Sequence, residues 1–175
     1  MAADGDVWHL VEARREDGVA TMFRIRELAP RHELSHIFVV EMPYPTTELS
    51  RLPNALAYRK LAQFEDQWVI PACHALGWEP VALKIEDGSF FLYMYGAGDP
   101  EQLMMKLAPY DAALGFYDDS DPGWGEYATL RELLDAAKAM PKTADKPKPR
   151  ARAAAKTKAI QNKKKAPAKP ARKKR

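Results

Sequence analysis

The apolar residues of this chain stop at one point, and this boundary limits what can fold. From Pro141 to Arg175 the only large apolar residue is Ile160, whereas Lys and Arg number 15 against the single acid Asp145. The formal charge of this tail is +14, and residues 1–140 carry −11, which together give the +3 of the whole chain. Dense like charge with five prolines and almost no apolar surface cannot form a core. The sequence therefore predicts one acidic domain over residues 1–140 and a disordered basic tail over residues 141–175.

Short apolar or alternating runs predict the strands of the acidic domain. They cover residues 7–14, 19–26, 34–42, 81–87, 89–96 and 112–118. Asp17-Gly18 and Asp87-Gly88 supply the positive backbone angle that a hairpin turn requires, so the first two runs and the fourth and fifth runs are predicted to form hairpins.

Three further segments have helical periodicity. Apolar residues recur at steps of three to five from Asn54 to Leu76, which predicts a long helix that Pro71 kinks and Gly77 ends. Asp99 and Pro100 are typical N-cap and first helical residues of a short helix that runs to Leu107. The last helix is predicted from about Trp124 to Met140.

The order of these elements indicates the fold class. From the third strand onward the order is β-α-β-β-α-β, which is that of ferredoxin-like folds. We predict an α+β fold: a ferredoxin-like split β-α-β sandwich preceded by an N-terminal β-hairpin, with a closing C-terminal helix and a disordered basic tail. The predicted sheet is antiparallel and has its helices on one face.

The acidic stretch YDDSDPGWGEY, residues 117–127, admits two interpretations. A calcium-binding loop of the EF-hand type that starts at Asp119 would place Trp124 where a glycine is required, so that spacing fails. We predict instead that Asp121 caps the last helix, that Pro122 is its first helical residue, and that Trp124 and Tyr127 pack on the sheet. A functional acidic patch remains the open alternative.

A second motif raises the possibility of an enzyme. His32-Glu33-Leu34-Ser35-His36 matches H-E-x-x-H, which binds zinc when a helix places both histidines on one face. The motif follows Pro30 and runs into a predicted strand, where the two histidines would lie roughly 13 Å apart. We therefore predict no catalytic residues, no metal site and no cofactor. The question of an enzyme stays open, and the alternative function is a metal-dependent hydrolase that uses His32, Glu33 and His36.

The cysteine content and the N-terminus indicate a compartment. Cys73 is the single cysteine, which excludes an internal disulfide, and we interpret it as a buried apolar thiol. The N-terminus has neither the basic nor the apolar region of a signal peptide, and no apolar run approaches the length of a membrane span. We predict a cytoplasmic protein that does not engage a membrane.

Several motifs resemble a bacterial domain-of-unknown-function family, the one numbered 695. They are the closing motif FYDDSDPGWGEY, Leu52-Pro53 ahead of the long helix, Phe64-Glu65-Asp66 within it, and Asp87-Gly88, and the resemblance extends over most of residues 7–135. Phe90 stands where the family usually has an arginine, so no role of that arginine carries over. Several members resemble the RraB-type protein inhibitors of ribonuclease E. The resemblance implies an acidic ferredoxin-like domain that binds a protein and has no established catalytic residues.

The basic tail predicts a partner of its own. Its composition resembles the tails of linker histones and of bacterial nucleoid-associated proteins, which neutralise phosphate backbones without reading sequence. Two alternatives remain open, namely a solubilising extension and a tail that folds back on the acidic domain. The predicted DNA- or RNA-binding residues are Lys146, Lys148, Arg150, Arg152, Lys156, Lys158, Lys163, Lys164, Lys165, Lys169, Arg172, Lys173, Lys174 and Arg175. The predicted function is a non-enzymatic adaptor or regulatory domain that binds an unidentified protein and is tethered to nucleic acid by this tail.

Overall fold

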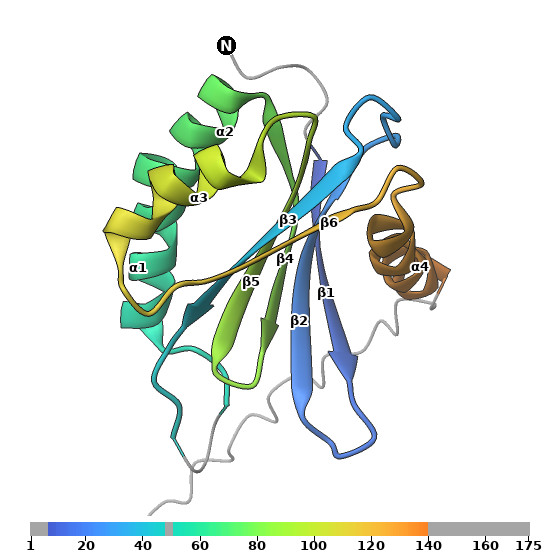
Figure 1. Cartoon of the computed structure of the whole chain (residues 1–175). Helices are drawn as coiled ribbons and strands as arrows, with labels where there is room; N and C mark the ends of the chain where they lie inside the picture. Colours follow the sequence, from blue (N-terminus) through green and yellow to red (C-terminus); the bar gives the residue numbers. More distant parts are fainter. Residues whose placement is uncertain (1–6, 48–50, 140–175) are drawn as a thin grey trace, which may run out of the picture. The chain divides into compact units, whose positions relative to one another are not determined.

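The computed structural model describes residues 7–47 and 51–139, which form a mixed α and β structure around one antiparallel sheet (Figure 1). The six strands follow the predicted runs, with ends that differ by a few residues. They are β1 (Val7–Arg14), β2 (Ala20–Glu27), β3 (His36–Pro43), β4 (Trp78–Glu86), β5 (Ser89–Gly96) and β6 (Gly115–Ser120). Their order across the sheet is β1-β2-β4-β5-β3-β6, so the N-terminal hairpin pairs with β4, and β3 lies between β5 and β6.

The predicted helices are present, and one of them contains an irregular turn. The long helix consists of α1 (Ala55–Phe64), the π-helical turn η1 (Glu65–Val69) and α2 (Ile70–Leu76). In η1 the Ile70 N–H bonds to the Glu65 carbonyl, five residues earlier, and this wider turn immediately precedes Pro71, which has no N–H to donate. The others are α3 (Pro100–Leu107), the 3₁₀ turn η2 (Ala108–Tyr110) and α4 (Gly125–Ala139).

The predicted Asp99 cap of α3 and the predicted end of α2 at Gly77 are confirmed, and Asn54 caps α1. The Asn54 side chain accepts a hydrogen bond from the Ala57 N–H at 2.9 Å, and Asp99 accepts one from Glu101 at 2.9 Å. Gly77 ends α2 with a φ of 71°, a left-handed conformation in which glycine has no steric penalty.

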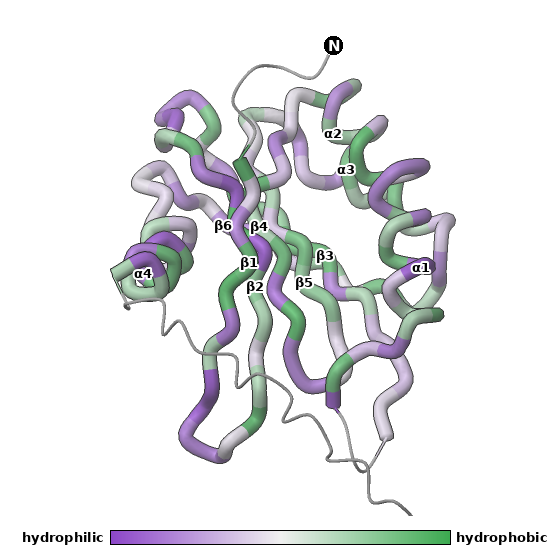
Figure 2. The backbone as a smooth tube through the Cα atoms, turned by 180° about the vertical axis from the view of Figure 1, so that it is seen from behind, coloured by the Kyte–Doolittle hydropathy of each residue, from purple (hydrophilic) through white to green (hydrophobic). Residues whose placement is uncertain are grey.

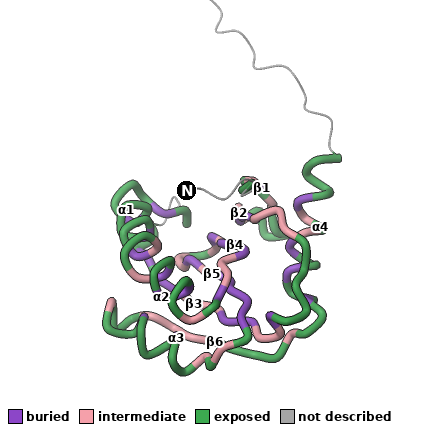
Figure 3. Tube along the Cα trace, turned by 90° about the horizontal axis from the view of Figure 1, so that it is seen from above, coloured by how far each residue is buried: buried purple, intermediate pink, exposed green. Residues whose placement is uncertain are grey.

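The helices cover both faces of the sheet, and the prediction of helices on one face was wrong. Helices α1, α2 and α3 pack on one face, and α4 packs on the other (Figures 1 and 3). The cause is visible in β5, whose side chains alternate between two cores. Phe90, Leu92 and Met94 belong to the core on the α1–α3 face. Tyr93 and Tyr95 belong to the core on the α4 face. A strand that is apolar on both faces requires cover on both. Figure 2 shows the hydrophobic residues in the central strands and the hydrophilic ones at the tip of the β1–β2 hairpin.

A cluster of charged side chains ties α4 to the β1–β2 hairpin. The Glu27 carboxylate lies 2.7 Å from His9 Nε2, 2.9 Å from Arg131 Nη2 and 2.9 Å from Lys138 Nζ. Hydrogen bonds from Lys138 and from His9 lower the pKa of Glu27 from 4.5 to about 2. The carboxylate is therefore stabilised by contacts that exist only in the folded chain.

Replacing Glu27 with glutamine is expected to change the acid stability of the domain. Because the folded pKa lies below the unfolded one, the contribution of Glu27 is fully present above pH 4.5 and is lost as the pH falls toward about 2. The stability difference between the native chain and Glu27→Gln should therefore shrink across this window, as measured by urea unfolding at a series of pH values. A difference that stays constant from pH 6 to pH 2 would contradict the charge cluster.

Candidate functional site

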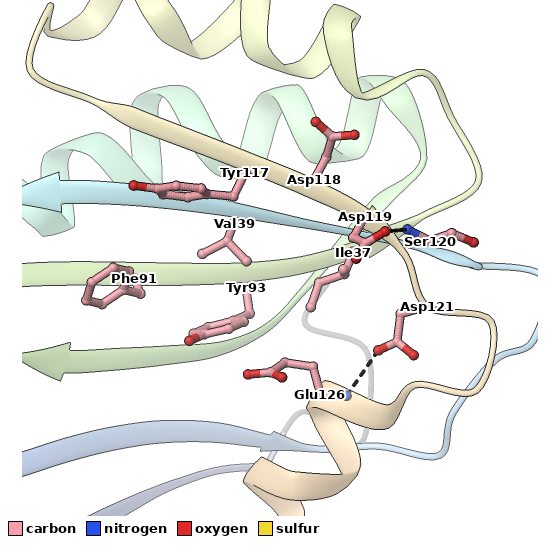
Figure 4. A pocket seen from close by; sticks show the side chains of 10 residues that line it. All are labelled: Ile37, Val39, Phe91, Tyr93, Tyr117, Asp118, Asp119, Ser120, Asp121 and Glu126. Carbon is pink, nitrogen blue, oxygen red and sulfur yellow. Dashed lines mark hydrogen bonds between the residues drawn. The ribbon is translucent and has the colours of Figure 1, made fainter.

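One part of the sheet lies open beside α4. This helix contacts β1, β2 and β4 most extensively, and Tyr95 of β5 lies beneath its first turn, while the same face of the last strand, β6, stays open. A shallow concavity of about 610 Å³ lies there (Figure 4), and we call it the sheet shelf. It is lined by Ile37, Val39, Phe91, Tyr93, Tyr117, Asp118, Asp119, Ser120, Asp121 and Glu126.

The floor of the sheet shelf is aromatic and aliphatic. Strand register places Val39 between Tyr93 of β5 and Tyr117 of β6, and Phe91 lies next along β5. Tyr117 lies on the edge strand β6 and is 55% exposed, so a large aromatic side chain faces solvent there. The shelf therefore presents the Tyr117 side chain to solvent beside a floor in which Phe91 and Val39 are half-buried and Tyr93 is buried.

Tyr117 is held in place across the sheet. Its hydroxyl donates to Glu41 Oε2 at 2.8 Å, and the Ser89 hydroxyl donates to Glu41 Oε1 at 2.8 Å. The hydrogen bond to Glu41 raises the pKa of Tyr117, so the phenol keeps the proton that it donates. Gly115 leaves room for this contact, because a Cβ at that position would lie 3.3 Å from the Glu41 Cβ and 3.4 Å from the Tyr117 hydroxyl.

Asp121 connects the sheet shelf to the start of α4. It accepts hydrogen bonds from the Tyr95 hydroxyl at 2.6 Å and from the backbone N–H groups of Gly125 and Glu126 at 2.8 and 3.0 Å. Burial alone would raise the pKa of Asp121, but these hydrogen bonds outweigh burial and lower the pKa. The predicted capping role of Asp121 is confirmed.

Trp124 explains why α4 begins after Pro122, close to the start predicted at about Trp124. Its φ is 55°, and its indole is fully buried and stacked on Tyr95 with ring centroids 4.1 Å apart. The indole N–H donates to the Leu34 carbonyl at 2.8 Å. The left-handed residue that brings the indole inward interrupts the helix, so α4 starts at Gly125, and the prediction that Pro122 is the first helical residue was wrong. The predicted packing of Trp124 and Tyr127 on the sheet is confirmed.

The remaining wall of the sheet shelf is acidic. Asp119 and Glu126 are exposed, and Figure 4 shows Asp118 on the side of β6 away from Tyr117. Of the ten lining residues, four are acidic and none is basic. Carboxylates beside aromatic faces attract ammonium and guanidinium groups through ion pairing and cation–π contact. The arrangement can therefore bind Lys or Arg side chains.

The H-E-x-x-H segment does not form the helix that zinc proteases use. His32 and Glu33 lie in an exposed turn, and His36 is the first residue of β3. His32 Nδ1 lies 3.4 Å from the Pro122 carbonyl, and His36 Nδ1 lies 3.4 Å from the Ser35 hydroxyl. Within residues 7–47 and 51–139, no three His, Cys, Asp or Glu side chains are grouped as a metal site.

Other residues named from the sequence have clear structural positions. Cys73 is buried, its Sγ lies 3.3 Å from Met94 Sδ, and burial raises the pKa of its thiol to about 12. The thiol is therefore protonated at neutral pH and is a poor nucleophile. Phe90 is fully buried in the core beneath α1 to α3. The basic residues predicted to bind nucleic acid lie in 141–175, outside the residues that the structure describes.

Phe91 and Tyr93, which build the floor of the sheet shelf, were not predicted from the sequence, although the acidic stretch 117–127 was. Phe91 and Tyr93 follow each other at a spacing of two, which places them on one strand face, and Tyr117 lies in the quoted acidic stretch. The spacing could have indicated a shared face. The contacts of Glu41 with Tyr117 and with Ser89 depend on β3 lying between β5 and β6, which no local pattern specifies.

Comparison with protein-family models, curated proteins and solved structures gave no match for this chain. No helix among residues 7–47 and 51–139 combines the length and apolar character needed to cross a membrane.

Proposed function

We propose that this protein is a non-enzymatic adaptor: an acidic domain that binds a basic segment of a protein partner through the sheet shelf and is tethered to DNA or RNA by its basic tail. The observation that carries the proposal is the open aromatic floor of the shelf beside an acidic wall. No substrate chemistry is required of these residues, only recognition.

The proposed fold family is ferredoxin-like. Strands β3, β4, β5 and β6 are connected as β-α-β-β-α-β and lie in the order β6-β3-β5-β4, which supports this assignment. The β1–β2 hairpin extends that sheet at β4. The resemblance to the RraB-type inhibitors, which are small acidic domains that bind a protein, supports the same proposal.

The charge of the domain favours a basic partner. Residues 1–140 carry a formal charge of −11, which attracts cationic segments over about a Debye length of roughly 8 Å at physiological salt. At the shelf itself, an ammonium or guanidinium group can stack on Tyr117 while it pairs with Asp119 or Glu126, whereas the Phe91 ring already lies 5.7 Å from Lys84 Nζ. Long-range attraction draws a basic partner to the domain. The preformed floor then favours Lys and Arg side chains, whose aliphatic stems can lie on it.

Reversing two exposed charges of the sheet shelf should weaken partner binding. In Asp119→Lys/Glu126→Lys, both changes lie at exposed positions, and the partner's affinity should fall by at least about tenfold, since like charges then face each other. The measurement is affinity capture with the full chain and with residues 1–140 after nuclease treatment, followed by titration of each captured protein. Glu16→Lys/Glu132→Lys, at exposed positions outside the shelf lining, is the matched control.

The outcomes separate the parts of the proposal. The proposal is supported by proteins that stay captured after nuclease treatment, bind residues 1–140, and fail to bind only the shelf variant. Equal loss with both variants would mean that net charge alone acts, and full retention by the shelf variant would exclude the shelf as the binding site. If no protein is captured with or without nuclease, the adaptor function is wrong.

A further inference from the structure

A second cavity lies on the other face of the sheet, between the β1–β2 hairpin and the segment η1–α2. The core on the α1–α3 face is built against β3, β4 and β5, and it contains few side chains of β1 and β2. A cleft of about 800 Å³ therefore opens beside these two strands. We call it the hairpin cleft. Its volume is within the range of small-molecule binding sites, and it is larger than the sheet shelf.

Apolar side chains form the two sides and the base of the hairpin cleft. Trp8 of β1 is 37% exposed, and Ile70 of α2 is 53% exposed. Trp78 is buried at the base, where its ring packs on Gly96 so closely that a Cβ there would lie 2.4 Å from Trp78 Cδ2. The cleft can therefore hold a flat or aliphatic body between fixed apolar walls.

Arginine side chains converge on the same cleft. The Arg24 guanidinium lies 5.0 Å from the centre of the Trp8 ring and pairs with Glu65, and Arg31 Nη2 lies 2.6 Å from Glu79 Oε2. The side chains of Glu65 and Glu79 are 17% and 19% exposed, against 37% for Arg24 and 50% for Arg31. Glu65 and Glu79 therefore lie deeper than the Arg24 and Arg31 guanidinium groups that they pair with. The cleft is also lined by the exposed Asp66 and by Arg26, which pairs with Glu79 at 2.8 Å.

The backbone brings Glu65 into this position through an uncommon turn. Glu65 is the first residue of the π-helical turn η1, and such turns in α-helices occur frequently at functional sites. Burial raises the pKa of Glu65 and Arg24 opposes this, which agrees with a carboxylate held beneath the surface.

Two buried donors beside the cleft have no hydrogen-bond acceptor among the described residues. They are Arg24 Nε and the indole Nε1 of Trp78; one buried acceptor there, Glu79 Oε2, also lacks a hydrogen bond but keeps its ion pair with Arg31 at 2.6 Å. A buried donor without an acceptor costs free energy, which an acceptor group entering from the cleft can recover.

We propose that the hairpin cleft binds an anion carried on an apolar body, such as an aromatic carboxylate. The carboxylate pairs with Arg24 and Arg31, and the apolar body lies between Trp8 and Ile70. This site is on the opposite face from the sheet shelf, so it does not rest on the proposed adaptor function. The contrasting interpretation is that the ion pairs only fasten the hairpin to the helix, in which case the cleft does not distinguish anions from neutral molecules.

Three small molecules of matched shape test the proposal. They are 3-phenylpropionate, its neutral amide and 3-phenylpropylamine, titrated into the full chain at 0.15 M salt. The chain has four tryptophans and none in residues 141–175, so the indole N–H signals in a nitrogen–proton NMR spectrum report location. We expect the Trp8 and Trp78 signals to shift, the Trp124 signal to stay in place, and the carboxylate to bind at least about tenfold more tightly than the amide.

Variants connect the effect to individual side chains. Arg31→Gln should weaken carboxylate binding about fivefold or more, and Trp8→Leu should weaken both the carboxylate and the amide. Arg51→Gln, an exposed arginine paired with Asp87, is the control and should leave binding unchanged. An unshifted Trp124 signal in each variant verifies that the fold is retained.

Two arms distinguish the sources of the anion. A pentapeptide ending in a free phenylalanine carboxylate and the same peptide with a C-terminal amide are compared with 3-phenylpropionate. Tighter binding of the free-acid peptide identifies a protein C-terminus as the natural source, and tighter binding of the small molecule identifies a metabolite. The proposal is overturned if amine and amide bind as tightly as the carboxylate, if Arg31→Gln has no effect, or if no probe shifts the Trp8 and Trp78 signals.

Discussion

Trp124→Ala should lower the free energy of unfolding by ~3 to 5 kcal/mol, the range for truncating a buried large aromatic side chain. The indole is fully buried, stacked on Tyr95 and edge-on to Tyr127, and its N–H bonds to the Leu34 carbonyl. Alanine would leave a cavity between α4 and the sheet and a carbonyl without its donor. It would also keep the left-handed backbone, whose cost the buried indole no longer offsets.

Asp119→Ala lies in the same acidic stretch and is the comparison variant for Trp124→Ala. Asp119 is exposed and accepts a hydrogen bond only from the neighbouring Ser120 N–H among the described contacts, so Asp119→Ala should change stability by less than ~0.5 kcal/mol. Urea unfolding of the full chain measures both. A larger effect of Asp119→Ala, or a melting temperature that rises with calcium, would show that the acidic stretch binds an ion.

Deleting residues 141–175 should abolish binding to duplex DNA and structured RNA. The tail carries 15 basic residues and a net +14, whereas residues 1–140 at −11 are repelled by phosphate. If about six basic side chains engage at once, log affinity should fall with log salt at a slope near −5 for DNA, about a thousandfold between 50 and 200 mM. The measurement is a mobility-shift titration at several salt concentrations.

The predicted binding of nucleic acid by the tail can also be tested by comparing the isolated tail with the full chain. The isolated tail should bind DNA more tightly than the full chain, most clearly at low salt, because the acidic domain competes with phosphate. Unfolding of the domain should keep its midpoint after the deletion, because the core residues belong to the domain. Equal binding with and without the tail, or binding insensitive to salt, would rule out tethering through phosphate neutralisation.

Much of the local structure could be predicted because it is encoded within a few neighbouring residues. Asn54 and Asp99 cap helices through their own side chains, and Gly77 supplies a left-handed helix end. The hairpin turns at Gly18 and Gly88 have positive φ, as the Asp-Gly pairs predicted. Such signals do not depend on the rest of the fold.

What could not be predicted depends on contacts between distant residues. The start of α4 is set by Trp124, whose backbone angle follows from stacking on Tyr95, a residue of another strand. The sheet shelf requires β6 beside β3, and the hairpin cleft requires β2 beside β4. Capping rules alone favoured Pro122 as the helix start. They do not include the left-handed backbone at Trp124 that places its indole in the core.

The strand order also governs how the sheet can assemble during protein synthesis. β3 is apolar and central, yet its partners β5 and β6 come roughly 50 and 80 residues later in the chain, and β2 must wait for β4. In a growing chain one edge of β3 therefore stays unpaired until β5 has left the ribosome, and the other edge until β6 has. Unpaired strand edges promote wrong association between nascent chains, so for this sheet the hazard lasts until β6 pairs with β3.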